Sequence, residues 1–95
     1  MRTVSLTARA LIDLDQIATY SKRHFGEQQA QIYLTALKAA LVKLSAHPFV
    51  GPAVNKRART HRLVFRYHIV FYRIGEDEIV VLKLTDARRR DARHL

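Results

Sequence analysis

The sequence predicts an α+β domain in which a helical hairpin packs on one face of a small antiparallel sheet, in the order β-α-α-β-β-β. Apolar residues recur every three or four positions over 8–46, as they do along one face of a helix. Residues 60–84 are instead rich in Val, Ile, Phe and Tyr, the residue types favoured in strands. The 95 residues contain no linker rich in Gly, Ser or Pro, so 1–95 is expected to form a single domain.

A short strand and a first helix are predicted at the beginning of the chain. Residues 2–6 alternate apolar and polar side chains, and Thr7 is placed to cap the helix that follows. Gly26 ends this helix, because glycine readily adopts the positive φ that a helix end often requires. We assign Asp13 and Asp15 to the solvent-facing surface of the helix. Its apolar stripe comprises Leu11, Leu14, Ile17 or Ala18, Ser21 and Phe25.

A second helix is predicted immediately after Gly26. Pro48 ends it near Ala46, since proline cannot continue a helix. Two helices joined by a single glycine turn form an antiparallel hairpin, whose shared apolar stripe needs a further surface to cover it. The stripe of the second helix comprises Ala30, Tyr33, Leu34, Leu37, Leu41 and Leu44.

Three strands are predicted to supply that surface, after a loop at 48–58. Because only short turns separate these strands, they form an antiparallel meander. In the middle strand, odd-numbered residues such as Phe71 share one face and even-numbered residues such as Tyr72 share the other. We expect one face to take the helices and the other to remain available. The three strands are predicted at 59–64, 67–74 and 78–84.

The net charge is +9, from 17 Lys and Arg against 8 Asp and Glu. A compact domain of this charge attracts anionic partners, such as nucleic acid, an acidic membrane surface or an acidic protein. Residues 56–73 contain six cations and no acid, and a flexible basic tail is expected from about 86. No segment is apolar enough to span a membrane, and the absence of cysteine suits a reducing, cytoplasmic compartment.

Several kinds of catalytic site are excluded by composition and spacing. A chain with no cysteine has no disulfide, iron–sulfur cluster or thiol nucleophile. The five histidines include no pair at metal-ligand spacing, so no metal and no cofactor is expected. The three glycines are scattered and form neither a phosphate-binding loop nor a Gly-x-Ser-x-Gly elbow.

The remaining candidate site is basic and aromatic and lies on the predicted meander and just after it. In a metal-independent ribonuclease, such cations stabilise the charged phosphate while a His, Tyr or Glu moves protons. In a binding module, they contact an acidic protein or a nucleic-acid backbone, and the aromatic side chains act as anchors. In a third interpretation, the aromatic residues only pack the sheet. The residues concerned are Arg62, Arg66, Tyr67, His68, Tyr72, Arg73, Lys83, Arg88, Arg89 and Arg90.

Five short motifs stand in an order that is typical of one known family. They are Tyr-x4-Phe-Gly at 20–26, Ala-x2-Tyr at 30–33, His-Pro-x-Val-Gly at 47–51, Arg-Tyr-His-Ile-Val-Phe-Tyr-Arg at 66–73 and Ala-Arg-Arg-x-Asp at 87–91. Together with the predicted order β-α-α-β-β-β, they resemble the ParE branch of the RelE/ParE toxin superfamily over about residues 7–91.

This resemblance implies the toxin of a bacterial type II toxin–antitoxin module, associated with plasmid stabilization and growth arrest and neutralised by a cognate antitoxin in a hetero-oligomer. ParE-like toxins with a known target inhibit DNA gyrase by direct binding, without chemistry of their own. RelE-like relatives are ribosome-dependent mRNA endoribonucleases, which use a His or Tyr near the end of the last strand. This chain has Thr85 and Asp86 there. We therefore expect a gyrase inhibitor, with the endoribonuclease as the alternative and a non-toxic nucleic-acid-binding domain as the third hypothesis.

Two sets of contact residues are expected, and no catalytic residue is assigned. An acidic, partly disordered antitoxin segment is expected to fold across the helical hairpin and the adjoining sheet. In a nuclease, proton transfer would fall to His68, predicted in mid-strand, or to His94. The target-binding set is Arg66, Arg73, Lys83, Arg88, Arg89 and Arg90, and the antitoxin-binding set is Arg2, Arg9, Ile12, Tyr20, Ile32 and Tyr33.

Overall fold

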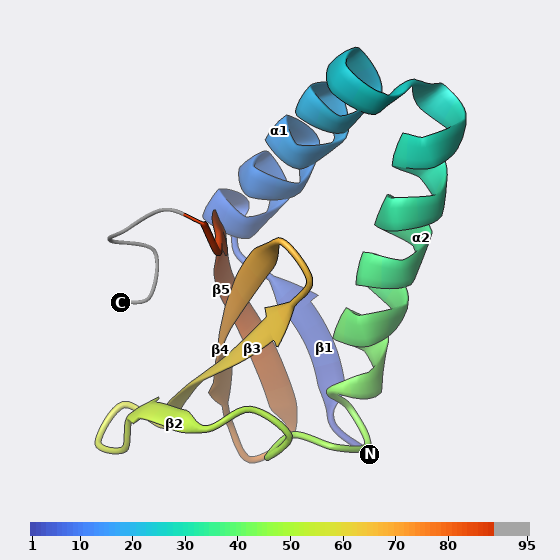
Figure 1. Ribbon diagram of the computed structural model, residues 1–95. Coiled ribbons are helices and arrows are strands. Elements are labelled where there is room, and N and C mark those ends of the chain that lie inside the picture. The colour runs from blue at the N-terminus through green and yellow to red at the C-terminus, as the bar shows by residue number, and fades with distance from the viewer. Residues whose placement is uncertain (89–95) are drawn as a thin grey trace.

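The computed structural model describes residues 1–88 and consists of a helical hairpin packed against a five-stranded sheet (Figure 1). This arrangement confirms the predicted α+β fold class. Arg89, Arg90 and His94, which the sequence analysis singled out, lie outside the described residues. The elements are β1 (Thr3–Leu6), α1 (Ala8–Phe25), α2 (Glu27–Lys43), β2 (Ala53–Asn55), β3 (Thr60–Phe65), β4 (His68–Ile74) and β5 (Glu78–Asp86).

The sheet has the strand order β1-β5-β4-β3-β2 and is mixed. Strands β2 to β5 form an antiparallel meander, whereas β1 pairs parallel with β5 at one edge. The long helical crossover between β1 and the other strands allows this parallel pairing, which a tight turn could not. The three strands predicted for the meander are present, and β2 adds a short strand within the segment predicted as a loop.

Both predicted helices are present, with the predicted caps. Thr7 Oγ1 accepts a hydrogen bond from the Ala10 amide at 3.0 Å and donates one to the Leu82 carbonyl at 2.7 Å. Gly26 alone connects α1 to α2 with a φ of 85°, a conformation that glycine adopts without strain. The predicted stripe of α2 packs toward the core. The stripe of α1 is displaced by one position, since Leu11 is 58% exposed and Ala10 is fully buried.

Each face of the sheet has its own buried cluster. Facing the helices, β4 and β5 contribute Val70, Tyr72, Ile74, Ile79, Val81 and Leu84, which pack with Leu37, Leu41 and Leu44. On the opposite face, Ile69 and Phe71 are completely buried beneath Val54, Leu82 and Ala87. The expectation that this second face remains available is therefore wrong at its centre, because apolar side chains of β2 and β5 cover it.

A β-bulge in β5 determines which residues of its second half face the helices. Phe71 pairs with Lys83 and Tyr72 with Val81, which leaves Leu82 as the extra residue. Such an extra residue reverses the alternation of side chains along the strand. As a result, Asp86 lies opposite His68, on the face of the sheet that carries the helices. Without the bulge, the carboxylate of Asp86 would point to the other face.

The loop at 47–51, which contains one of the sequence motifs, encloses the hydroxyl of Tyr72. This hydroxyl donates to the Pro48 carbonyl at 2.7 Å and accepts from the Gly51 amide at 3.1 Å. Burial raises the pKa of Tyr72, whereas the hydrogen bond from Gly51 has the opposite effect. The motif thus satisfies a polar group in the core. Neither α1 nor α2, the helices of the described chain, is both long and apolar enough to cross a membrane.

Candidate functional site

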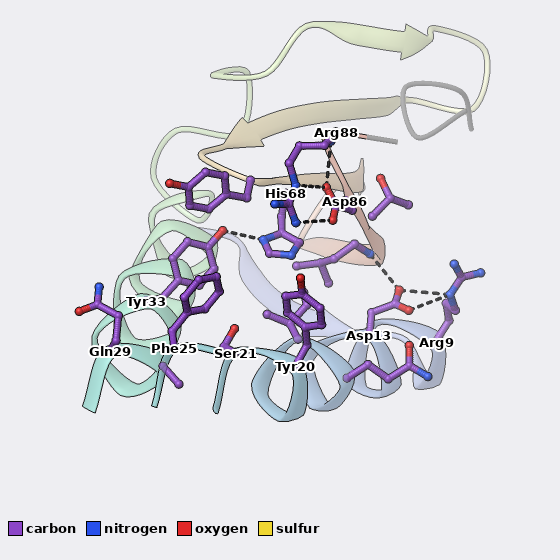
Figure 2. A pocket seen from close by; sticks show the side chains of 16 residues that line it. Arg9, Asp13, Tyr20, Ser21, Phe25, Gln29, Tyr33, His68, Asp86 and Arg88 are labelled. Atoms are coloured by element: carbon purple, nitrogen blue, oxygen red, sulfur yellow. Dashed lines mark hydrogen bonds and ion pairs between the residues drawn. The ribbon is translucent and has the colours of Figure 1, made fainter. Parts of the chain in front are cut away.

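A cleft of about 610 Å³ opens between the helical hairpin and the end of the sheet where β4 begins and β5 ends. Figure 2 shows aromatic side chains from both helices around this cleft, with the side chains of His68, Asp86 and Arg88 on the sheet side. Within residues 1–88, no cluster of three or more His, Asp or Glu side chains could hold a metal ion. The lining is therefore apolar and aromatic, with a few charged groups at its edges.

Tyr33 and His68 are joined across the cleft. The Tyr33 hydroxyl lies 2.6 Å from Nδ1 of His68, and the two rings are 5.5 Å apart (Figure 2). Burial lowers the pKa of His68; the carboxylate of Asp86 opposes this effect and Arg88 adds to it. Burial likewise raises the pKa of Tyr33. At neutral pH both groups are therefore uncharged, and the contact is a hydrogen bond between neutral rings. His68 is the first residue of β4, so its prediction as a mid-strand residue is wrong.

Asp86 and Arg88 form an ion pair at the mouth of the cleft. Arg88 Nη2 lies 2.8 Å from one carboxylate oxygen of Asp86, and Nε and the backbone amide of Arg88 donate to the other. These hydrogen bonds hold the pKa of Asp86 at about 2 and raise the pKa of Arg88. The guanidinium of Arg88 also lies over the ring of Tyr67, at 5.6 Å from its centroid.

Asp13 connects α1 to β5 at the other end of the cleft. Its carboxylate accepts the Leu84 amide at 3.0 Å and both oxygens receive hydrogen bonds from Nε of Arg9 (Figure 2). The pairing of β1 with β5 ends at Leu6, so Asp13 occupies the edge of β5 beyond that point. Asp13 is 8% exposed, and its assignment to the helix surface is wrong. Its spacing from Ala10 and Ile17, three and four residues away, is the signal that places it on the buried face.

The stability of the protein should fall as the pH is lowered below about 6.5, because His68 binds its proton less readily in the folded state than in the unfolded state. The contribution is complete above the unfolded pKa and is lost as the pH falls toward the lower folded pKa. Urea unfolding between pH 7.5 and 5 measures it, and His68→Gln should flatten this part of the profile. An NMR titration that gave His68 a folded pKa at or above the ordinary histidine value would contradict the expectation.

The residues expected to contact an antitoxin are divided by the structure into three groups. Arg9, Tyr20 and Tyr33 line the cleft (Figure 2). Ile12 and Ile32 are exposed on the helices outside the cleft lining. Arg2 lies at the opposite end of the sheet, where its Nε donates to the Gly75 carbonyl at 2.9 Å.

The residues expected to contact a target lie on two separate surfaces. Arg73 and Lys83 are on the face of the sheet away from the helices, where Lys83 Nζ is 5.0 Å from the centroid of the Phe71 ring. Arg66 lies in the turn between β3 and β4, with a φ of 52°, and Arg88 lies beside the cleft. These four cations therefore do not form one patch.

Solved structures with this fold belong to toxin–antitoxin systems. The chain superimposes on the structure titled chromosomal ParDE TA system from P. aeruginosa with a TM-score of 0.77, at 20% identity, covering 90% of this chain and 96% of that one. It also matches the toxin–antitoxin complex RelBE2 from Mycobacterium tuberculosis with a TM-score of 0.65, at 22% identity, covering 93% of each chain. At these identities the likeness establishes the fold, which is that of the RelE/ParE toxins.

The sequence comparisons are more specific. Residues 4–91 match the family model described as ParE toxin of type II toxin-antitoxin system, parDE. The chain is 41% identical over 76 residues to Toxin ParE1 of Caulobacter vibrioides, a match that covers 79% of both proteins. This chain therefore belongs to the ParE toxin family of type II toxin–antitoxin systems.

Proposed function

We propose that this ParE-type toxin acts in the cytoplasm by binding DNA gyrase, without catalysing a reaction, and that a cognate antitoxin neutralises it by occupying the cleft between the hairpin and the sheet. The observation that carries the proposal is the cleft itself, which is lined by aromatic and apolar side chains and whose arginines are already paired with carboxylates. Such a surface suits a folded peptide segment better than a phosphodiester.

The shape and lining of the cleft favour an amphipathic helix as the antitoxin segment. Apolar and aromatic side chains from α1, α2 and the sheet surround it on three sides, and they can receive the apolar face of a helix. The net charge of +9 favours an acidic segment. A segment that is disordered when free would gain most of its binding free energy from burying these aromatic rings.

Tyr20→Ala should weaken antitoxin binding about tenfold, since a half-exposed tyrosine that points into a binding cleft is a typical energetic anchor. Isothermal titration calorimetry with the purified antitoxin measures the change. Ile12→Ala is the matched control, because Ile12 is similarly exposed on α1 but outside the cleft lining. A greater loss for Ile12→Ala than for Tyr20→Ala would move the antitoxin site to the outer surface of the hairpin.

The gyrase proposal is tested by a supercoiling assay with purified gyrase. Inhibition with accumulation of cleaved DNA supports it. Two double variants then distinguish the basic surfaces: Arg73→Ala with Lys83→Ala on the outer face, and Arg66→Ala with Arg88→Ala beside the cleft. Lys22→Ala with Arg23→Ala removes the same charge from the exposed end of α1 and serves as the control. Unimpaired supercoiling by gyrase at a saturating toxin concentration would overturn the proposal.

A ribosome-dependent endoribonuclease is the second candidate function, and the position of His68 in the cleft beside Arg88 favours it. Against it, Asp86 has a pKa of about 2 and is a weak base at neutral pH. The pKa of Tyr33 is raised, and Arg9 and Arg88 are paired with carboxylates instead of being available for phosphate. Primer extension on translating ribosomes decides between the two: cleaved message with unaffected gyrase identifies the nuclease, and normal growth on induction identifies the non-toxic hypothesis.

A further inference from the structure

A second cleft, of about 600 Å³, lies at the end of the sheet opposite the antitoxin cleft. The first cleft includes the beginning of β4, whereas this one includes its end and the turn to β5. The start of β1 and the loop between β2 and β3 complete it, near the bottom of Figure 1. Its charged and aromatic lining residues are Arg2, Phe49, Lys56, Arg59, His61 and Glu76.

The two clefts differ in how their charges are balanced. The ion pairs of the described chain, 1–88, are Arg9–Asp13 and Arg88–Asp86, and both lie in the first cleft. The second cleft brings two arginines, a lysine and a histidine together with one carboxylate, Glu76, which forms none of these ion pairs. An excess of unneutralised cations in a concave surface attracts an anion.

The backbone around the second cleft holds its cations in place. Nε of Arg2 donates to the Gly75 carbonyl at 2.9 Å, which leaves its terminal nitrogens to contact a ligand. The loop that carries Lys56 and Arg59 is closed by the hydrogen bond from the Ala58 amide to Asn55 Oδ1 at 3.0 Å. Arg59 has a φ of 54°, a conformation that is unstrained only for glycine, and its carbonyl accepts the Ile74 amide at 3.0 Å.

His61 and Phe49 give this cleft an aromatic wall. Nδ1 of His61 lies 2.8 Å from the Gly51 carbonyl, which can only accept, so Nδ1 carries the hydrogen and Nε2 remains for a ligand. The His61 ring stacks on Tyr72 at 5.6 Å, and Phe49 packs against it edge-on at 5.8 Å. Phe49 is nevertheless 70% exposed. Exposed aromatic rings beside cations are the combination with which proteins bind single-stranded nucleic acid.

We propose that the second cleft binds a phosphodiester segment of single-stranded nucleic acid, in which Arg2, Lys56 and Arg59 contact phosphate oxygens and Phe49 stacks on a base. The fixed guanidinium of Arg2 suits a phosphate with two accessible oxygens. The site is separate from the antitoxin cleft and does not depend on whether gyrase is the target. A free phosphate offers the same oxyanion chemistry without a base, and the experiments below separate the two sources.

Fluorescence anisotropy with a labelled oligothymidylate of about eight nucleotides tests the site at several salt concentrations. Lys56→Ala combined with Arg59→Gly should weaken binding about tenfold and reduce the slope of log K against log salt by about 2, one for each lost phosphate contact. Glycine is chosen at 59 because it tolerates the positive φ there. Lys22→Ala with Arg23→Ala removes the same charge from α1 and should change affinity less than about twofold. An equal loss in both double variants would overturn the proposal.

Phe49→Ala tests the base contact, and its exposure makes unfolding a minor concern, which thermal unfolding by circular dichroism checks. It should weaken oligothymidylate binding about tenfold and leave unchanged the binding of an abasic strand of the same length. An equal effect on both strands would overturn the stacking contact. Displacement of the strand by inorganic phosphate at matched phosphate concentration would assign the site to free phosphate, and displacement by an acidic peptide of equal charge would overturn the assignment to nucleic acid.

Discussion

Gly51→Ala should destabilise the folded protein by about 3 kcal/mol or more, which corresponds to a fall in Tm of about 12 °C or more for a domain of this size. A Cβ atom at this position would lie 2.1 Å from the Arg62 carbonyl oxygen and 3.0 Å from the Tyr72 hydroxyl. The first of these neighbours is backbone in β3, so it cannot move aside without breaking the sheet. The change would also separate the Gly51 amide from the buried Tyr72 hydroxyl, to which it donates. Thermal and urea unfolding measure the effect.

Gly26→Ala is the control for this prediction. A Cβ atom at Gly26 would meet nothing within 4 Å, and its cost comes only from the positive φ of 85°, about 1 kcal/mol. The difference between the two variants therefore isolates the steric contact. If Gly51→Ala proved no more destabilising than Gly26→Ala, the loop at 47–51 would not be packed against β3 as the structure has it.

Asp13→Ala should destabilise the protein by about 2 kcal/mol, because it leaves the buried amide of Leu84 without an acceptor. The ion pair with Arg9 adds little, since the Arg9 side chain is 60% exposed and water replaces the lost contact. Arg9→Ala is accordingly expected to cost less than about 1 kcal/mol. Urea unfolding monitored by circular dichroism measures both variants.

Asp15→Ala is the matched control for Asp13→Ala, since Asp15 is an exposed carboxylate on the same helix. It should change the free energy of unfolding by less than about 0.5 kcal/mol. Amide hydrogen exchange provides a second readout, because Asp13→Ala should expose the Leu84 amide to solvent locally. Unchanged protection of that amide in Asp13→Ala would show that the carboxylate does not close the edge of β5.

The elements of the fold could be predicted from the sequence because each has a local signal. Gly26 and Thr7 mark the ends of α1 chemically, and the stripe from Ala30 to Leu44 repeats at helical spacing. The short strand β2 has no such signal, since three residues carry no readable alternation and β2 exists only through its pairing with β3. The displaced stripe of α1 has a related cause, because an alanine and an aspartate occupy positions where apolar residues were expected.

The site could be predicted only in part, because its geometry depends on register. The bulge at Leu82 decides that Asp86 faces His68, and nothing in the residues of β5 marks its position. Arg66 and Arg73 are close in sequence yet lie at different places on the sheet, so charge alone suggested one patch where the structure has two. Tyr20, Tyr33 and Arg9 were predicted as contact residues and do line the cleft, whereas Asp13 was missed as the residue that holds one of its walls.

The parallel pairing of β1 with β5 has a consequence for synthesis of the chain. The hydrogen bond from Thr7 to Leu82 spans 75 residues, and that from Leu84 to Asp13 spans 71. The helical hairpin can form while translation continues, but β1 has no neighbour until β5 has emerged from the ribosome. Contacts between residues so far apart form late and slow folding. Because α1 and β5 both line the cleft, the toxin fold and the surface we assign to the antitoxin are completed together, after translation has reached the end of β5.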